Sequence, residues 1–285
     1  MRKTTPPTET YLHNNAAASK ALTTLKGLIE GVVCDTKIND LERTKILEWI
    51  ESYAFLQKHP AVGSVFDYLS EALVDGVLTL EECNDISWLI ERNLHSYYDE
   101  TTQKIQELHG ILSGIAADKE ISSTELTYLW DWLNKNEVLK GFFPYDEIYS
   151  LVCQIGARKI LSTDEKNHLI NAFSWTDDAT ISTTSPFVPW EVDPVIKFEG
   201  KLFCVTGASK KMPRSKIADL INQRNGKVAN SITKGLDYLV VCAEANVAWT
   251  HATYGRKVEQ AIKLRRAGSK LALIAERDFW DVLVG

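Results

Sequence analysis

One turn signature recurs four times in the first 165 residues and constrains the fold more than any other feature of the chain. It opens with Asp in three copies and Arg in the fourth. An aliphatic residue follows three positions later, then a small polar residue, and a glutamate three positions after that. The copies are Asp35–Glu42, Asp75–Glu82, Asp118–Glu125 and Arg158–Glu165. They start 40, 43 and 40 residues apart, a period typical of stacked helix pairs. The sequence therefore predicts an acidic all-α domain of four helix-hairpin repeats over residues 16–175.

Each copy of the signature also predicts where a helix begins. The small polar residue is a good N-cap, and the glutamate three positions later completes a capping box worth about 1 kcal/mol to its helix. The aliphatic residue before the cap occupies the hydrophobic staple position. The four caps are Asn39, Thr79, Ser122 and Ser162. Trp49 and Trp132 follow their signatures at the same offset, so we expect them to share one role in the core.

The acidic turns allow a second interpretation, which is metal binding. Turns of the form Asp-x-x-Ile-x-x-x-Glu resemble those of the helical tellurite-resistance TerB-like domains, whose acidic turn residues are thought to bind metal. The resemblance rests on the first three copies, because the fourth places Arg158 at the aspartate position. A capping box explains every glutamate without a metal, so we predict no metal site. A metal-responsive TerB-like stress protein stays as an alternative function.

Composition suggests the remaining boundaries. Residues 1–15 are polar, and we expect a flexible tail there. Residues 176–196 hold a Ser/Thr run and three prolines, which disfavour helix and strand, and we expect a linker.

The sequence has no apolar run near the ~18 residues that span a membrane, so we expect no membrane partner. Its five cysteines form no C-x-x-C pair, which favours a cytoplasmic location over a disulfide framework or a zinc site.

The hydrophobic period changes after Phe198. The apolar run Leu202–Val205 predicts a strand buried on both faces, and a Thr-Gly turn follows it. Further strands are expected at Lys227–Ala229, Tyr238–Val241 and Leu271–Ile274, with helices at Ser215–Arg224, Arg256–Arg266 and Asp278–Val284. This order predicts an α/β domain with a four-stranded parallel sheet over residues 197–285. The whole chain is then an α+β multidomain protein.

The two halves differ in the sign of their charge. Residues 197–285 hold 16 Lys and Arg against 8 Asp and Glu, whereas residues 1–196 hold 16 against 30. A basic half joined to an acidic half indicates that the basic part meets a polyanion. Attraction between the two halves is the alternative explanation.

Several short motifs in the second half occur in a recognisable order. They are Phe198-Glu199-Gly200-Lys201, Thr206-Gly207, Asn225-Gly226-Lys227-Val228, Ser231-Ile232-Thr233, Tyr238-Leu239-Val240 and Trp280. Together they resemble a BRCT domain, the module at the C-terminus of NAD-dependent DNA ligases and in the large subunit of the eukaryotic clamp loader. The resemblance covers about a third of the chain.

The resemblance implies a phosphate site at the end of the first strand. In BRCT domains that bind phosphate, the Ser or Thr of the Thr-Gly turn and a Lys at the start of the second helix hold it. Members that bind DNA ends add an Arg near the start of the first helix. The matching residues here are Thr206, Lys257 and Arg214, with the Gly207 N–H as a further donor. The residues alone point the same way, because backbone amides and cations at the carboxyl end of a buried strand suit an anion.

Three more residues complete the predicted phosphate and DNA-binding set, and they are Ser209, Lys210 and Arg256. Ser209 and Lys210 lie in the basic run after the Thr-Gly turn. Arg256 precedes Lys257, and either side chain is a candidate for the inward position. The alternative to a phosphate site is that Thr206 only forms a turn and the cations are solvated. The BRCT domain would then bind protein.

No catalytic set is recognisable in the sequence. The K-x-D-G adenylation motif, a Walker loop and a G-x-G-x-x-G turn after a strand are all absent. We therefore expect a non-enzymatic protein without a cofactor that binds 5′-phosphorylated DNA ends or nicks in DNA repair or replication. The second hypothesis is an adaptor that docks phosphoproteins or other proteins. The acidic helical domain is expected to hold a protein partner.

Overall fold

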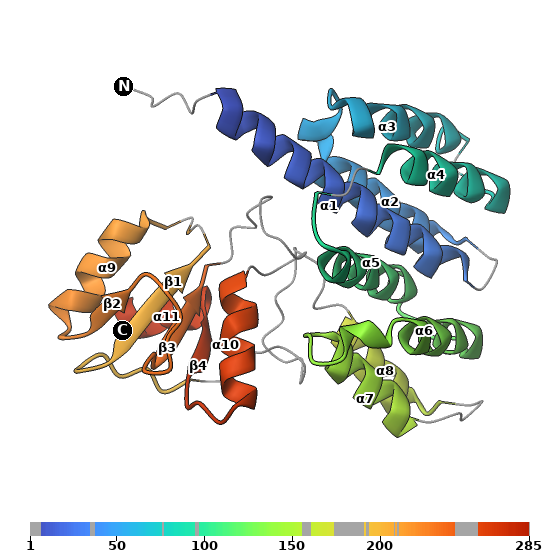
Figure 1. The fold of residues 1–285 in the computed structure, drawn as a ribbon. Helices are drawn as coiled ribbons and strands as arrows, with labels where there is room; N and C mark the ends of the chain where they lie inside the picture. Colours follow the sequence, from blue (N-terminus) through green and yellow to red (C-terminus); the bar gives the residue numbers. More distant parts are fainter. Residues whose placement is uncertain are drawn as a thin grey trace. The chain divides into compact units, whose positions relative to one another are not determined.

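The computed structural model describes residues 7–34, 38–75, 77–94, 97–155, 161–173, 191, 194–207, 209, 211–242 and 256–284. The chain divides into two compact units, an N-terminal helical unit and a C-terminal unit built on a sheet (Figure 1). The α+β class expected from the sequence is therefore confirmed. Within the described ranges, no helix combines the length and the hydropathy needed to cross a membrane.

The helical unit consists of helices joined by short connections. They are α1 (Pro7–Val33), α2 (Asp40–Ser52), α3 (Pro60–Ala72), α4 (Leu80–Asn93), α5 (Glu100–Ile115), α6 (Ser123–Lys135), α7 (Tyr145–Ile155) and α8 (Thr163–Phe173). Two short 3-10 turns, η1 (Ala54–Leu56) and η2 (Glu137–Leu139), follow α2 and α6. Each turn signature connects the two helices of one hairpin.

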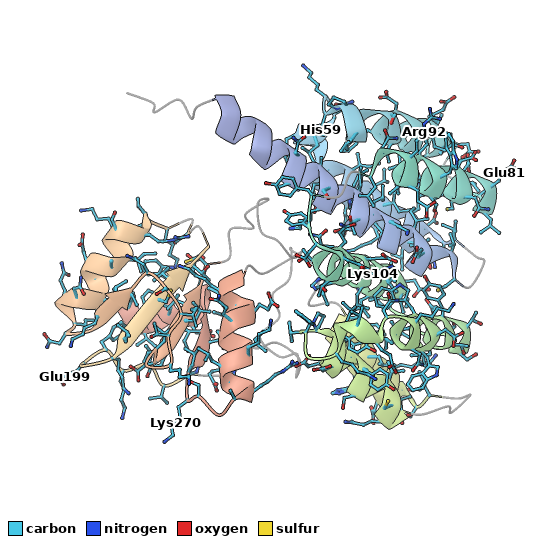
Figure 2. All side chains as sticks on the ribbon, viewed as in Figure 1. His59, Glu81, Arg92, Lys104, Glu199 and Lys270 are labelled. Atoms are coloured by element: carbon cyan, nitrogen blue, oxygen red, sulfur yellow. The ribbon has the colours of Figure 1, made fainter. Side chains whose placement is uncertain are left out.

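The expected flexible tail over residues 1–15 needs a correction, because α1 begins at Pro7. Proline suits the first helical position, where its fixed φ is helical and its missing N–H has no intrahelical partner to lose. At the other end of this stretch, Asn15 Oδ1 lies 2.9 Å from Nε2 of His59, which is labelled in Figure 2. A tertiary contact thus reaches a stretch whose composition alone indicates a tail.

All four predicted capping boxes are present. Asn39, Thr79 and Ser122 cap α2, α4 and α6 with the reciprocal bonds of the box. At α8, the Ser162 N–H donates to Glu165 Oε2 at 2.9 Å, and the Glu165 N–H donates to Ser162 Oγ at 3.2 Å. The helix starts predicted from these turns are confirmed.

The four hairpins form two matching pairs whose equivalent residues are 83 positions apart. Trp49 in the first pair corresponds to Trp132 in the second, and both indoles are buried. Both are therefore core residues, as expected, and the Trp132 indole N–H also donates to Glu107 Oε1 at 3.3 Å. The structural repeat is therefore two hairpins long, α1–α4 and then α5–α8.

These two halves meet where α1 crosses α5. A Cβ atom built on Gly27 would lie 2.0 Å from the Glu107 carbonyl oxygen, and one on Gly110 would lie 2.1 Å from the Thr24 carbonyl oxygen. Thr24 and Glu107 are themselves equivalent positions, so the contact is reciprocal, like the contact of a symmetric dimer. Glycine at the crossing lets the two backbones touch.

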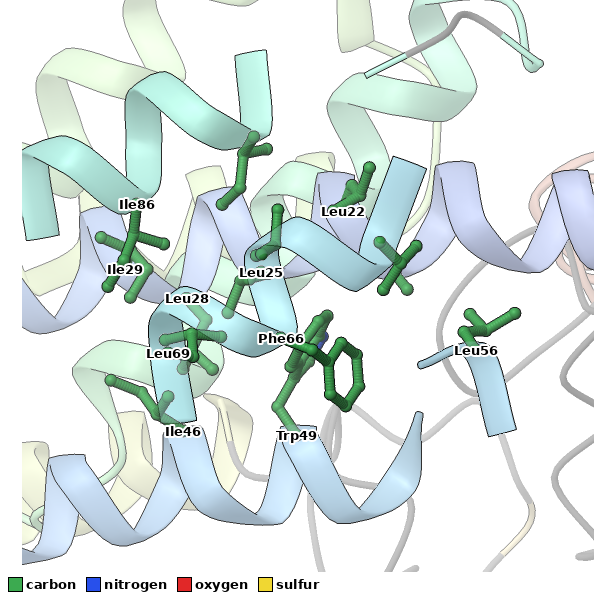
Figure 3. Packing of buried hydrophobic residues seen from close by; sticks show 14 of the residues in the cluster. Leu22, Leu25, Leu28, Ile29, Ile46, Trp49, Leu56, Phe66, Leu69 and Ile86 are labelled. Carbon is green, nitrogen blue, oxygen red and sulfur yellow. The ribbon is translucent and has the colours of Figure 1, made fainter. Parts of the chain in front are cut away.

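Aliphatic and aromatic side chains fill the core of the first half. α1 contributes Leu22, Leu25 and Ile29, and they pack with Ile46, Trp49, Phe66, Leu69 and Ile86 from the next three helices (Figure 3). Each fully buried side chain of this size contributes about 1.5–3 kcal/mol. This core keeps the amphipathic helices together.

The C-terminal unit is a four-stranded parallel sheet with helices around it. Its elements are β1 (Leu202–Thr206), α9 (Arg214–Gln223), β2 (Lys227–Ala229), β3 (Tyr238–Val241), α10 (Arg256–Arg266), β4 (Ala272–Ala275) and α11 (Glu276–Val284). The strand order is β2-β1-β3-β4 and every neighbouring pair is parallel. The predicted parallel sheet is confirmed, with strand and helix ends within two residues of those expected.

The two faces of the sheet are covered by different helices. Phe203 and Val205 of β1 belong to a core cluster with Ile217 of α9 and Phe279 of α11. Figure 1 shows α10 on the side of the sheet away from α9. Successive strand residues point to opposite faces, so Cys204 of β1 faces α10.

Packing in this unit begins before the expected domain start at residue 197. Ile196 is buried in the same core cluster, although the sequence suggests a linker there. The Glu191 N–H also donates to the Leu273 carbonyl of β4 at 2.8 Å. The expected linker residues Phe187, Val188 and Trp190 lie outside the described residues.

Candidate phosphate-binding site

The predicted site lies at the carboxyl end of β1. Thr206 is the last residue of the strand and is buried, and its carbonyl accepts the Cys242 N–H at 2.8 Å. Gly207 follows with φ 82°, a backbone conformation that residues with a Cβ rarely adopt. The strand therefore ends directly at its threonine, and the backbone changes direction at Gly207.

Arg214 is held against this turn. It is the first residue of α9, and its Nε and Nη2 donate to the Gly207 carbonyl at 3.2 and 2.8 Å. The guanidinium has five N–H donors, so donors remain for a ligand. The predicted arginine thus lies beside the predicted glycine.

Lys257 reaches the same strand from the opposite face. It is the second residue of α10, and its Nζ lies 3.7 Å from Cys204 Sγ. Burial raises the pKa of the Cys204 thiol, while the positive charges of Lys257 and Arg214 act in the opposite direction. Both cations are therefore close enough to Cys204 for their charges to affect it.

Ser209 does not take the role that the sequence suggests. Its hydroxyl donates to the buried carboxylate of Glu276, at the start of α11. The same carboxylate oxygen accepts the Trp280 indole N–H at 3.0 Å. Ser209 therefore ties the loop after β1 to α11. This arrangement also places an acidic group near an edge that was expected to be cationic.

The loop is held by one further contact. Lys211 Nζ lies 5.2 Å above the centre of the Trp280 ring, and the Lys211 N–H donates to Ser209 Oγ at 3.1 Å. A cation over an indole face is a favourable arrangement. The loop that precedes α9 is thus fixed at two points on α11.

Two predicted site residues cannot be placed. Lys210 and the side chain of Arg256 lie outside the described residues. The remaining five divide into two groups. Thr206, Gly207, Arg214 and Lys257 come together at the end of β1, while Ser209 contacts α11.

Two residues near this edge are absent from the predicted set. Cys204 lies two positions before Thr206 on the same face, a relationship that strand alternation indicates in the sequence. Glu276 follows β4 directly, so the parallel topology brings it to the same edge. The signal for each is its register in a strand rather than a motif.

A cavity of about 430 Å³ lies at the opposite, amino end of the strands. Its lining includes Lys201, Asp237, Tyr238 and Lys270, the last labelled in Figure 2. Lys201 and Asp237 form an ion pair, with 2.7 Å between Lys201 Nζ and Asp237 Oδ1. None of the predicted phosphate-binding residues lines this cavity.

The acidic turns of the helical unit form hydrogen bonds within the protein. Asp75 Oδ1 accepts the Val77 N–H at 2.9 Å, and Asp118 Oδ2 accepts from Asn39 Nδ2 at 3.1 Å. Across the part of the chain that the structure describes, no three His, Cys, Asp or Glu side chains cluster in a way that could hold a metal ion. Asp35, the first acid of the first signature, lies outside the described residues.

Comparison with known families supports the fold seen here. Residues 193–265 match the BRCA1 C Terminus (BRCT) domain. This segment is a BRCT domain. The match starts close to Ile196, where packing of the C-terminal unit begins. It does not extend into the helical unit.

DNA ligases are among the curated relatives that match, and they match over 85 to 88 residues. The DNA ligase of Sorangium cellulosum (strain So ce56) is 40% identical over 85 residues, which is 27% of this chain and 11% of the ligase. The DNA ligase of Thermoanaerobacter sp. (strain X514) is 33% identical over 88 residues, 31% of this chain and 11% of that ligase. The chain thus spans about a tenth of the length of these relatives. No solved structure is a significant match to the chain.

Proposed function

We propose that this chain is a non-enzymatic DNA-binding protein whose BRCT domain recognises a 5′-phosphorylated DNA end or nick, in DNA repair or replication. The observation that carries the proposal is the arrangement at the end of β1. Arg214 contacts the Gly207 carbonyl and Lys257 contacts Cys204, so two cations from two helices flank the buried Thr206.

A terminal phosphate fits this arrangement chemically. It carries two negative charges near neutral pH and accepts several hydrogen bonds. A hydroxyl and two cations can bind it together, and each charge-assisted hydrogen bond is worth about 1.5–3 kcal/mol. α9 and α10 both begin at this edge, so the positive ends of their helix dipoles favour an anion there.

Glu276 limits the site to the side of the edge away from α11. Its carboxylate repels an anion that approaches Ser209, so we place the phosphate between Thr206, Arg214 and Lys257. Lys211, whose ammonium lies over the Trp280 ring, is exposed next to this edge, and we expect it to contact a neighbouring backbone phosphate. Contacts of this kind make affinity fall with salt.

The relatives support the DNA part of the proposal within limits. They are named as DNA ligases, and the similarity covers the BRCT segment alone. The adenylation motif K-x-D-G is absent from this sequence, so we propose DNA recognition without ligation. The acidic helical unit would then recruit a protein partner.

The test is a fluorescence anisotropy titration of the full chain with two duplexes that differ only in a 5′-phosphate or 5′-hydroxyl. We expect tighter binding of the phosphorylated duplex and an affinity that drops steeply with salt. Arg214→Ala and Lys257→Ala should each weaken binding of the phosphorylated duplex several-fold. Lys227→Ala is the matched control, because Lys227 is an exposed cation on the edge strand β2.

Equal binding of the two duplexes by the unmodified chain would exclude end recognition. A phosphopeptide arm separates the remaining outcomes. If a phosphoserine peptide binds, loses affinity in the same two variants and the duplexes do not bind, the chain is an adaptor for phosphoproteins instead.

A further inference from the structure

Lys257 of α10 contacts Cys204, a buried side chain outside the set proposed to bind phosphate. Cys204 is completely buried in β1, yet its sulfur is the atom that the Lys257 ammonium approaches, at 3.7 Å. A lysine ammonium always needs hydrogen-bond acceptors. Here a strand side chain supplies one.

The position of the sulfur matters because of the strand geometry. Cys204 and Thr206 lie on the same face of β1, two residues apart, which separates them by about 6.6 Å. An amine held at Cys204 therefore lies next to the threonine at the end of the strand. From this position the ammonium reaches a phosphate at Thr206 by a small movement of the lysine side chain.

We propose that Cys204 is a positioning residue for the phosphate site, holding the Lys257 ammonium beside Thr206. This inference rests on the proposed function. A thiol suits the task because sulfur is a weak acceptor, and the ammonium can keep this contact while its other N–H groups donate to an arriving phosphate. A carboxylate at this position would pair with the lysine and compete with the ligand.

The second buried cysteine of this sheet supplies the control. Cys242 is just as buried and lies directly after β3, but it belongs to the core cluster on the α9 and α11 face. Its thiol pKa is raised to about 12 by burial and by the charge of Glu276, with Arg214 acting in the opposite direction. Lys257 contacts Cys204, whereas Cys242 packs in the cluster that includes Ile217 of α9 and Phe279 of α11. Truncating Cys242 therefore perturbs the core without touching the lysine.

The experiment compares Cys204→Ala, Cys204→Ser and Cys242→Ala in the full chain. We expect Cys204→Ala to weaken binding of the 5′-phosphorylated duplex by about threefold to tenfold, because binding must then order the lysine side chain that Cys204 otherwise holds. Binding of the 5′-hydroxyl duplex should stay the same. Cys204→Ser retains an acceptor and should bind as the unmodified chain does, and so should Cys242→Ala.

A double-mutant cycle with Lys257→Met separates positioning from general damage. If Cys204 acts through the lysine, Cys204→Ala should add no further loss once Lys257 is methionine. Additive losses, or equal losses in Cys204→Ala and Cys242→Ala, would overturn the inference.

An NMR readout without DNA keeps this inference distinct from the proposed function. In ¹⁵N-labelled protein, the Lys257 ammonium should give a detectable, ordered signal that weakens in Cys204→Ala and persists in Cys242→Ala. If the intensity of the Lys257 ammonium signal does not change in Cys204→Ala, the contact between the two side chains is refuted. Equal binding of the two duplexes by the unmodified chain would instead refute end recognition, whatever the ammonium signal shows.

Discussion

Gly27 and Gly110 occupy equivalent positions in α1 and α5, and each lies against the backbone of the other helix. A side chain at either position would overlap a carbonyl oxygen, with Cβ to oxygen distances of 2.0 and 2.1 Å. The acceptor residues Glu107 and Thr24 are equivalent as well, 83 positions apart. The crossing is therefore symmetric within one chain, and it joins the two halves of the helical unit.

The first prediction concerns this crossing. Gly110→Ala should lower the unfolding free energy by about 2 kcal/mol or more, because forced separation of packed backbones outweighs the gain of about 1 kcal/mol from alanine's helix propensity. Urea unfolding followed by circular dichroism measures the change. Gly235→Ala is the control, since a Cβ there meets nothing within 4 Å. Unchanged stability of Gly110→Ala would contradict the close packing of α1 on α5.

The second prediction tests a capping box. Ser122→Ala should destabilise the helical unit by about 1 kcal/mol, because the Glu125 N–H loses its acceptor at 3.1 Å. The neighbouring Ser123→Ala is a matched control, since Ser123 is exposed and begins the helix without capping it. Thermal unfolding of both variants checks the difference. Equal melting temperatures for the two would rule out a stabilising role for the box.

The third prediction concerns the pH dependence of the BRCT domain. Burial tends to raise the pKa of Asp237, but hydrogen bonds from Lys201 Nζ and the Leu202 N–H, together with the lysine charge, hold it below its ordinary value. A carboxylate with a lowered folded-state pKa stabilises the fold above its unfolded pKa, near 3.9. That stability is lost as pH falls through the lower, folded value.

The measurement is a series of unfolding curves between about pH 6 and pH 2, a range that brackets the ordinary aspartate pKa. Asp237→Asn should reduce the loss of stability of the BRCT domain at the acid end, because the ionisable group is gone. Asp219→Asn is the control, as Asp219 is exposed on α9. If both variants keep the acid dependence of the unmodified chain, Asp237 does not contribute to it.

The fourth prediction concerns the acidic group next to the phosphate site. Glu276→Gln removes one negative charge at this edge but retains an acceptor for Ser209 and Trp280. We expect tighter binding of the 5′-phosphorylated duplex by a few-fold and a steeper dependence on salt. Asp281→Asn, an exposed change further along α11, is the control. Weaker binding in Glu276→Gln would show that the carboxylate supports the site rather than opposing it.

Much of the fold follows from local patterns. The capping residue Ser162 and its partner Glu165 are three positions apart, so the hydrogen bonds at the start of α8 can be predicted from one short segment of the sequence. The apolar run from Leu202 likewise identifies β1, because a parallel strand must be buried on both faces. The candidate site residues Thr206, Gly207, Arg214 and Lys257 came from the resemblance to BRCT domains, and their positions at strand and helix ends point the same way.

The parts that the sequence left open depend on distant contacts. Ser209 is part of a basic run, yet its hydroxyl meets Glu276, 67 residues further along the chain. Pro7 begins a helix in a stretch that looks like a tail. In both places the local composition is compatible with more than one outcome.

The sequence alone determined the capped starts of α2, α4, α6 and α8 and the places of the strands along the chain, because caps and hydrophobic period act within a few residues. The tertiary structure decided that α1 and α5 touch at their glycines, that Lys257 rests on Cys204 and that Glu276 holds Ser209. The reason is physical. Each of these contacts joins segments far apart in the chain, and only the packed fold brings their atoms within reach of one another.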